Sequence, residues 1–273
     1  MSTASYVALQ PSGQPAAASA APAQLAPTLE QLWATANTLN KPGVSRTFYG
    51  VGQAQTVVAV SVPAKSSEAG EAGENGLKEM SRKTAAVATH ALKAANANKL
   101  AIDPLYSAHS AAVGATLASW TFNLKSTTAA KKELDKVELS VLGGQAEPTL
   151  ASDKPSGGKI PLDWDTGIIY GQAQNLAREL MELPANLMTP SLFCDRAEKE
   201  FHAIPNVTLQ AHGLDWAKEK KMGAFISVNA GSADHEPLRF LEVHYKGAAN
   251  KDEGTFSWSG PTCPPTPTPP LWC

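Results

Sequence analysis

The chain has 273 residues, of which 43% are hydrophobic and 18% charged, a balance that allows a sizeable buried core. It carries 23 basic and 25 acidic residues, and the formal net charge of −2 gives no electrostatic reason to expect nucleic acid or an anionic membrane surface as a partner. DNA binding is disfavoured in particular, because neutralising phosphates needs a basic surface.

The chain also shows no sign of a targeting or membrane-spanning segment. No lysine or arginine precedes Lys41, and no apolar run approaches the roughly 20 residues that a bilayer span needs. The three cysteines, Cys194, Cys263 and Cys273, have neither the even number of a disulfide scaffold nor the paired spacing of a zinc site. We therefore expect a soluble protein of the cytoplasm.

The first 28 residues are rich in Ala, Pro, Ser and Gln and have little apolar bulk to offset the entropy of ordering. This composition predicts a mostly disordered arm over residues 1–28, although residues 5–10 are compatible with a short strand.

A globular pattern follows over residues 29–150. The sequence predicts strands over 56–62, 100–103 and 136–142, a loop over 66–76, and helices over 77–95 and 107–120. Alternating strands and helices indicate an α/β layer architecture with a largely parallel sheet.

Pro148, Pro155 and paired glycines predict a loop and a domain boundary near residue 150. A linker over 151–184 then contains a helix expected from about Asp165 to Leu183, since Pro184 disfavours helical geometry in the residue before it. Arg178 and Glu182 are spaced to support this helix as an i,i+4 pair.

Residues 185–253 have the pattern of an incomplete second α/β domain. The expected elements are a helix from Pro190, a strand over 207–210, a helix over 214–222, and strands near Phe225 and over 238–246. Residues 254–273 form an atypical tail whose many prolines lack the amide that a sheet ladder needs.

Several residues raise candidate chemistries that the sequence alone does not support. His235 and His244 flank a predicted strand with Glu236 and Glu242 nearby, but we expect ordinary histidines there, as at His90 and His109 on predicted helices. Cys194 lies in the first turns of a helix, with neither a base nor an electropositive pocket evident, and a small buried residue is expected. The Gly143-Gly144 and Gly157-Gly158 pairs are expected to be turns.

Six segments resemble landmarks of the leucyl (cytosol) aminopeptidases, peptidase family M17. They are Arg46-Thr47-Phe48-Tyr49-Gly50, Gly171-Gln172-Ala173-Gln174-Asn175-Leu176-Ala177-Arg178, Leu183-Pro184-Ala185-Asn186, Met188-Thr189-Pro190, Met222-Gly223-Ala224-Phe225-Ile226-Ser227-Val228 and Leu241-Glu242-Val243-His244-Tyr245-Lys246-Gly247. The resemblance covers about residues 40–253.

This resemblance implies a macrodomain-like N-terminal α/β domain, a linking helix and the start of a catalytic domain. It implies peptide substrates from which N-terminal residues, leucine above all, are released with the help of two divalent metal ions, zinc or manganese. It also implies assembly into homohexamers.

The chain departs from the family pattern where the metal ligands begin. Family members continue through an apolar strand into a glycine-rich loop whose lysine and aspartate bind the metals. Here Phe256-Ser257-Trp258 corresponds to the strand and Gly260 to the first loop glycine, but Pro261 stands at the lysine position. Later segments of the family supply the other ligands, a catalytic lysine and an arginine.

We therefore expect a truncated aminopeptidase that is catalytically inactive alone, and we assign it no catalytic, cofactor-binding or metal-binding residue. The alternative is a non-catalytic binding or regulatory module that docks on full-length subunits. Binding of an ADP-ribose-like ligand by the N-terminal domain is a further option by analogy of fold alone, and an incomplete second domain also favours aggregation.

Overall fold

The computed structural model of the chain describes residues 4–10, 12–36, 41–51, 54–63, 65–122, 137–144, 146–148, 150–155, 160–247 and 256–261. The chain divides into two compact units, Met1–Glu179 and Leu180–Cys273. The finer division into an arm, domain, linker, second domain and tail stays a prediction.

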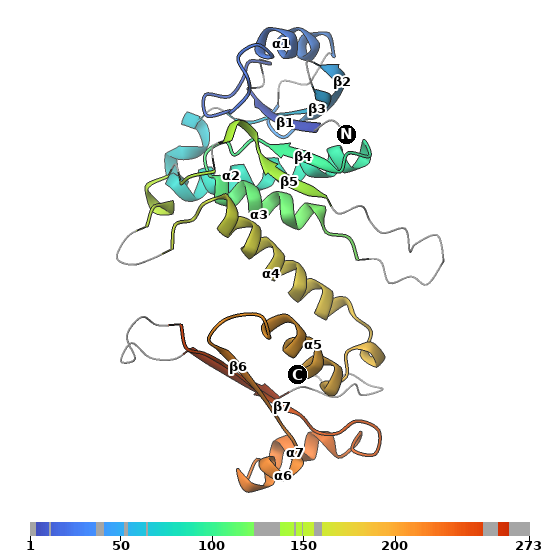
Figure 1. Ribbon diagram of the computed structural model, residues 1–273. Coiled ribbons are helices and arrows are strands. Elements are labelled where there is room, and N and C mark those ends of the chain that lie inside the picture. The colour runs from blue at the N-terminus through green and yellow to red at the C-terminus, as the bar shows by residue number, and fades with distance from the viewer. Residues whose placement is uncertain are drawn as a thin grey trace. The chain divides into compact units, whose positions relative to one another are not determined.

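The first unit is built on a five-stranded sheet with the order β2-β3-β1-β4-β5 (Figure 1). The strands are β1 (Ala4–Leu9), β2 (Ser45–Val51), β3 (Ala54–Ser61), β4 (Lys99–Ile102) and β5 (Glu138–Val141). β1 pairs in parallel with β3 and β4, and β4 with β5, while β2 and β3 are antiparallel. The expected α/β class with a largely parallel sheet is confirmed for this unit; the macrodomain-like description stays a prediction.

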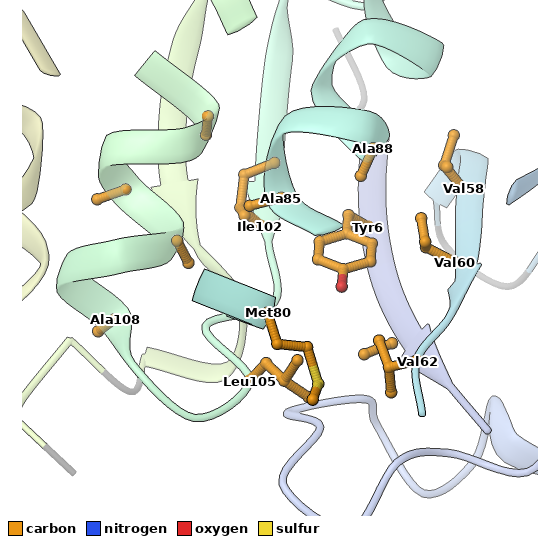
Figure 2. Packing of buried hydrophobic residues seen from close by; sticks show 14 of the residues in the cluster. Tyr6, Val58, Val60, Val62, Met80, Ala85, Ala88, Ile102, Leu105 and Ala108 are labelled. Atoms are coloured by element: carbon orange, nitrogen blue, oxygen red, sulfur yellow. The ribbon is translucent and has the colours of Figure 1, made fainter. Parts of the chain in front are cut away.

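Both faces of this sheet are covered by helices, so the central strands are apolar on both sides, as expected for parallel sheets. α1 (Ala26–Thr35) lies on one face, and α2 (Lys65–Ala94) and α3 (Ala108–Ser119) lie on the other (Figure 1). Val58 and Val60 belong to the cluster under α2 and α3, whereas Val57 belongs to the cluster under α1. Figure 2 shows Tyr6 of β1 in the middle of the larger cluster, between Val60 and Ile102.

The structure differs from the arm expected over residues 1–28, because β1 is the central strand of the sheet. Tyr6, Val7, Ala8 and Leu9 are all fully buried. The Ala- and Pro-rich composition of the whole segment predicts disorder, whereas the short strand considered at residues 5–10 is confirmed as β1. Pairing with β3 and β4 supplies the burial that the arm lacks by itself.

Two other local expectations were wrong. The loop expected over 66–76 is helical from Lys65, with an interruption at Gly73, whose φ of 55° is non-helical. The strand expected near Phe225 is the helix α7 (Gly223–Asn229), in which the Phe225 ring meets the Phe240 ring edge-on. A short apolar run has no periodicity that separates a strand from a helix, so packing decides.

α4 (Trp164–Glu182) begins in the first unit and confirms the linker helix expected at Asp165–Leu183. Its inner face approaches α3 closely: a Cβ at Gly167 would lie 2.4 Å from the His109 carbonyl oxygen, and one at Gly171 2.6 Å from the Thr116 Cβ. Arg178 donates to the Leu117 carbonyl at 3.1 Å and so binds α4 to α3. The expected i,i+4 pair with Glu182 stays a prediction. Before α4 come the short 3₁₀ turns η1 (Leu142–Gly144) and η2 (Ala151–Asp153).

The second unit contains a three-stranded antiparallel sheet, β6-β7-β8. After η3 (Ala185–Leu187), α5 (Pro190–Phe201) starts at Thr189, whose hydroxyl accepts from the Leu192 amide. β6 (Val207–His212), α6 (Leu214–Glu219), α7, β7 (Phe240–Tyr245) and β8 (Phe256–Pro261) follow. No helix among the described residues is long and apolar enough to cross a membrane.

Candidate functional site

Two histidines and a glutamate meet on one face of the second sheet. The antiparallel register aligns Gln210 of β6 with Glu242 of β7, and side chains alternate along a strand, so His212, Glu242 and His244 share that face. His212 Nε2 lies 2.9 Å from Glu242 Oε2, and His244 Nε2 lies 3.7 Å from the same oxygen. The cluster therefore places one carboxylate oxygen between two imidazole rings.

Aromatic packing fixes the His212 ring. Trp216 of α6 stacks on it with a centroid distance of 4.2 Å and an angle of 10°, and Trp216 also packs against Phe240 at 5.0 Å. One edge of the imidazole meets Glu242 while one face meets an indole. This arrangement restricts the ring to the orientation in which Nε2 reaches the carboxylate.

The two histidines change the pKa of the Glu242 carboxyl. Its hydrogen bond with His212 lowers the pKa of the Glu242 carboxyl below its usual value, and the charge of His212 and the contact with His244 act in the same direction. A carboxylate that orients an imidazole is also a common support for proton transfer.

The sequence pattern pairs His244 with His235, but the structure places them in different segments: His244 is in β7, next to Glu242. His235 lies in the turn before β7, where its amide donates to the Ser232 carbonyl. Glu236 accepts from the Ser191 amide at 2.8 Å, at the start of α5. The sequence did not identify His212 as a site residue, because the predicted strand ended at Gln210. The signal that identifies it is the alternation of side chains along paired strands: residues 208, 210 and 212 lie on the same face of the sheet as residues 240, 242 and 244.

The described residues do not fit a two-metal centre. Such a centre needs carboxylates that bridge two ions 3.5–4 Å apart, whereas this cluster offers one carboxylate between two imidazoles. No group of three or more His, Cys, Asp or Glu side chains among the described residues is arranged to hold a metal ion.

A cavity of about 500 Å³ lies between α5 and the opposite face of the same sheet. Its apolar side includes Cys194, Leu209 and Leu241, and Arg239 and Glu198 also line it. Cys194 is 7% exposed, and burial raises the pKa of its thiol. The expectation of a small buried residue is thus confirmed, since a raised pKa disfavours the nucleophilic thiolate.

Of the two glycine pairs considered for phosphate binding, the structure describes Gly143-Gly144, which forms a turn. Gly143 and Gly144 both have φ of 71° in the turn after β5, as the sequence predicts. A Cβ at Gly143 would lie 3.2 Å from the Ala20 Cβ, so this glycine allows close packing between loops. Gly157 and Gly158 lie outside the described residues.

Among the described residues, β8 lies at the edge of its sheet, and it includes Pro261, the residue where the family pattern changes. Gly260 pairs with Leu241, and Pro261 with Phe240. Proline is tolerated at a sheet edge, where its missing amide breaks no ladder. The backbone therefore remains a paired strand at Gly260 and Pro261, the positions at which the resemblance implies the start of a glycine-rich loop.

Comparison with known proteins finds similarity to the cytosol aminopeptidases. Residues 175–260 match the model of the cytosol aminopeptidase family, catalytic domain. The cytosol aminopeptidase of Xenopus tropicalis is 32% identical over 223 residues, and that of Homo sapiens 33% identical over 224 residues; each match covers 81% of this chain and 39% of the relative. The chain thus spans about two fifths of the length of these relatives.

Solved structures show the same fold. A tomato leucine aminopeptidase matches with a TM-score of 0.59 and 20% identity over 92% of this chain and 49% of that one. The bottromycin maturation enzyme BotP in complex with Mn matches with a TM-score of 0.59 and 19% identity over 90% of this chain and 46% of that one. The resemblance drawn from the sequence is confirmed.

Proposed function

We propose that this chain, related over four fifths of its length to the cytosol aminopeptidases, comprises the N-terminal domain, linking helix and first catalytic-domain strands of a metal-dependent leucyl aminopeptidase. The observation that carries the proposal is the match over residues 175–260, which runs from α4 to β8. The activity to which these residues contribute is release of N-terminal amino acids, leucine above all, from peptides. The names of the relatives also support a cytoplasmic location.

We further propose that these 273 residues do not hydrolyse peptides by themselves. The support is the residue pattern at β8, where Pro261, paired with Phe240, stands in place of the metal-binding lysine. A proline side chain has no donor atom for a metal ion or a substrate carbonyl. We accordingly propose zinc or manganese as the metal of the full-length relatives and not of this chain. One solved neighbour, BotP, is described in complex with Mn.

An activity assay on the purified chain tests this proposal. We expect hydrolysis of leucine p-nitroanilide to stay at the buffer rate with either Zn²⁺ or Mn²⁺, while the human relative under the same conditions is active. Isothermal titration calorimetry with each ion shows whether the chain fails to bind metal or binds metal without catalysing hydrolysis. We expect no stoichiometric binding of either ion. Metal-dependent hydrolysis by homogeneous chain would refute the proposal.

The second candidate is a non-catalytic module that docks on full-length subunits. The part of the chain that would dock is the first unit, which has a buried cluster on each face of its sheet. A co-expression experiment tests it: the chain and a full-length homologue carry different tags and are purified through one of the two tags. We expect the two to co-purify in fixed stoichiometry; purification of the homologue alone excludes this role. Self-association, which the resemblance implies, is part of the same proposal.

A further inference from the structure

The cavity between α5 and the second sheet combines an apolar wall with charges of both signs. Its volume of about 500 Å³ is in the range of small-molecule sites in proteins. Leu209 of β6 and Leu241 of β7 line it from the sheet, and Cys194 lines it from the helix. Leu241 is 2% exposed and Cys194 7%. Part of the wall is therefore already shielded from water and suits an apolar group of a ligand.

The positive charge of the cavity lies at the first turn of α5. Arg239, which directly precedes β7, donates from Nε to Ser191 Oγ over 3.4 Å, and both residues line the cavity. The nearby Glu236 carboxylate accepts from the Ser191 amide at 2.8 Å and is thereby held at the start of the helix. A guanidinium beside a hydroxyl, which can donate its own proton, is a suitable site for a carboxylate.

Two negative charges follow along the same face of α5. Asp195 lies one turn after Ser191, Glu198 lies about one turn further, and both line the cavity. Residues four apart on a helix are neighbours, with roughly 5–6 Å between their Cβ atoms. An ammonium group bound by Asp195 is therefore close enough to a carboxylate bound at Ser191 to belong to the same small molecule.

We infer that this cavity binds a free α-amino acid with an aliphatic side chain. Its carboxylate binds Arg239 and Ser191, its ammonium group binds Asp195, and its side chain packs against the two leucines of the sheet. An α-amino acid carries both charges on one carbon atom, with the apolar group beyond them. A simple anion would be repelled by Asp195 and Glu198, and a simple amine would be repelled by Arg239.

The inference goes beyond the proposed function, because it assigns a ligand to the second unit itself. Binding is measured without substrate, metal or a full-length relative, so the two proposals can fail separately. A metal ion is not the competing occupant, since the part of the chain that the structure describes has no group of three or more His, Cys, Asp or Glu arranged to hold one.

The first test is isothermal titration calorimetry of the purified chain with L-leucine. We expect one site with a dissociation constant between roughly 10 µM and 1 mM, as suits a ligand of this size. Glycine lacks the apolar group, N-acetyl-L-leucine the ammonium and L-leucinamide the carboxylate, and each should bind at least about tenfold more weakly. Lack of saturable L-leucine binding up to about 10 mM, or equal affinity for any of the three analogues, overturns the inference.

The second test removes each charge of the cavity. Asp195→Asn and Arg239→Gln should each weaken L-leucine binding by about tenfold or more. Asp215→Asn, at a fully exposed side chain of α6, and Arg196→Gln, on α5 but not among the cavity-lining residues, are the matched controls. We expect both controls to bind within about twofold of the wild type. Wild-type affinity in either cavity variant overturns the inference.

The third test fills the cavity without changing a charge. Ala211 lines the cavity from β6 and is exposed, so Ala211→Trp places an indole in the space of the ligand at a strand position that accepts aromatic residues. We expect loss of L-leucine binding with a circular dichroism spectrum that matches the wild type. Asp195 is also exposed, so these two variants decide the question if Arg239→Gln does not fold. Binding by Ala211→Trp at wild-type affinity would place the ligand elsewhere and refute the site.

Discussion

Lys78 of α2 and Asp153 of η2 form a nearly buried ion pair, with 2.5 Å between Nζ and Oδ1. The Asp153 side chain is 1% exposed and that of Lys78 23%. The Ser107 hydroxyl, which begins α3, donates to the other carboxylate oxygen at 2.8 Å. One carboxylate therefore joins α2, α3 and the segment that leads into α4.

Asp153→Asn should destabilise the first unit by about 2–4 kcal/mol, because it leaves the Lys78 ammonium without its countercharge in a poorly solvated site. Urea unfolding followed by circular dichroism measures the change. Glu138→Gln is the matched control: its pair with Lys99 has a similar distance of 2.9 Å, but both side chains are exposed. We expect that control to cost less than about 0.5 kcal/mol, and equal losses in the two variants would contradict the assigned role of burial.

Gly114→Ala should destabilise the first unit by roughly 1–3 kcal/mol or more, although alanine is the better helix former. A Cβ at Gly114 would lie 2.0 Å from the Arg82 carbonyl oxygen, so α2 and α3 would have to separate. Gly223→Ala is the control, because no atom lies within 4 Å of the added Cβ. Thermal unfolding should show a lower melting temperature for the first variant and an unchanged or higher one for the second.

The sequence predicted the elements whose signals are local. Ser107 and Thr189 cap helices at the expected starts of α3 and α5, and the β-branched run at 56–62 forms a central strand. The family resemblance was also predictable, because it depends on contiguous motifs. Composition, by contrast, misled the interpretation of residues 1–28, since the burial of Tyr6 depends on strands more than 50 residues away.

The contacts that organise the candidate site depend on strand register and could not be read from local patterns. His212 and Glu242 are 30 residues apart, and only the pairing of β6 with β7 brings them within 2.9 Å. The same applies to Asp103, whose carboxylate accepts from the Ala8 and Ala20 amides, 95 and 83 residues away. A sequence pattern identifies such residues as polar but not their partners.

Asp103 should make the first unit less stable as pH rises through the folded-state pKa of its carboxyl. Burial raises this pKa above its usual value, and hydrogen bonds from Ser19, Ala8, Leu105 and Ala20 only partly oppose the shift. The folded state then keeps a proton that the unfolded state has already lost, so rising pH favours unfolding in that window. Asp103→Asn cannot titrate, and its urea-unfolding profile from about pH 4 to 7 should lack this component. An identical profile in the two proteins would exclude the assignment.

Glu242 should show the opposite pH dependence in the second unit. Its pKa is lowered by the His212 hydrogen bond, so its contribution to stability is present above its unfolded-state pKa and is lost as pH falls through the lower folded-state value. Because the pair is only partly buried, Glu242→Gln should cost no more than about 1 kcal/mol at pH 6. Amide hydrogen exchange over β6 and β7, corrected for intrinsic rates, measures this locally. We expect lower protection in the variant at pH 6 and convergence with the wild type once the pH has fallen below the lowered folded-state pKa of Glu242. A difference that persists in more acidic solution would show that the side-chain shape, rather than the ionised carboxylate, stabilises the strand pair.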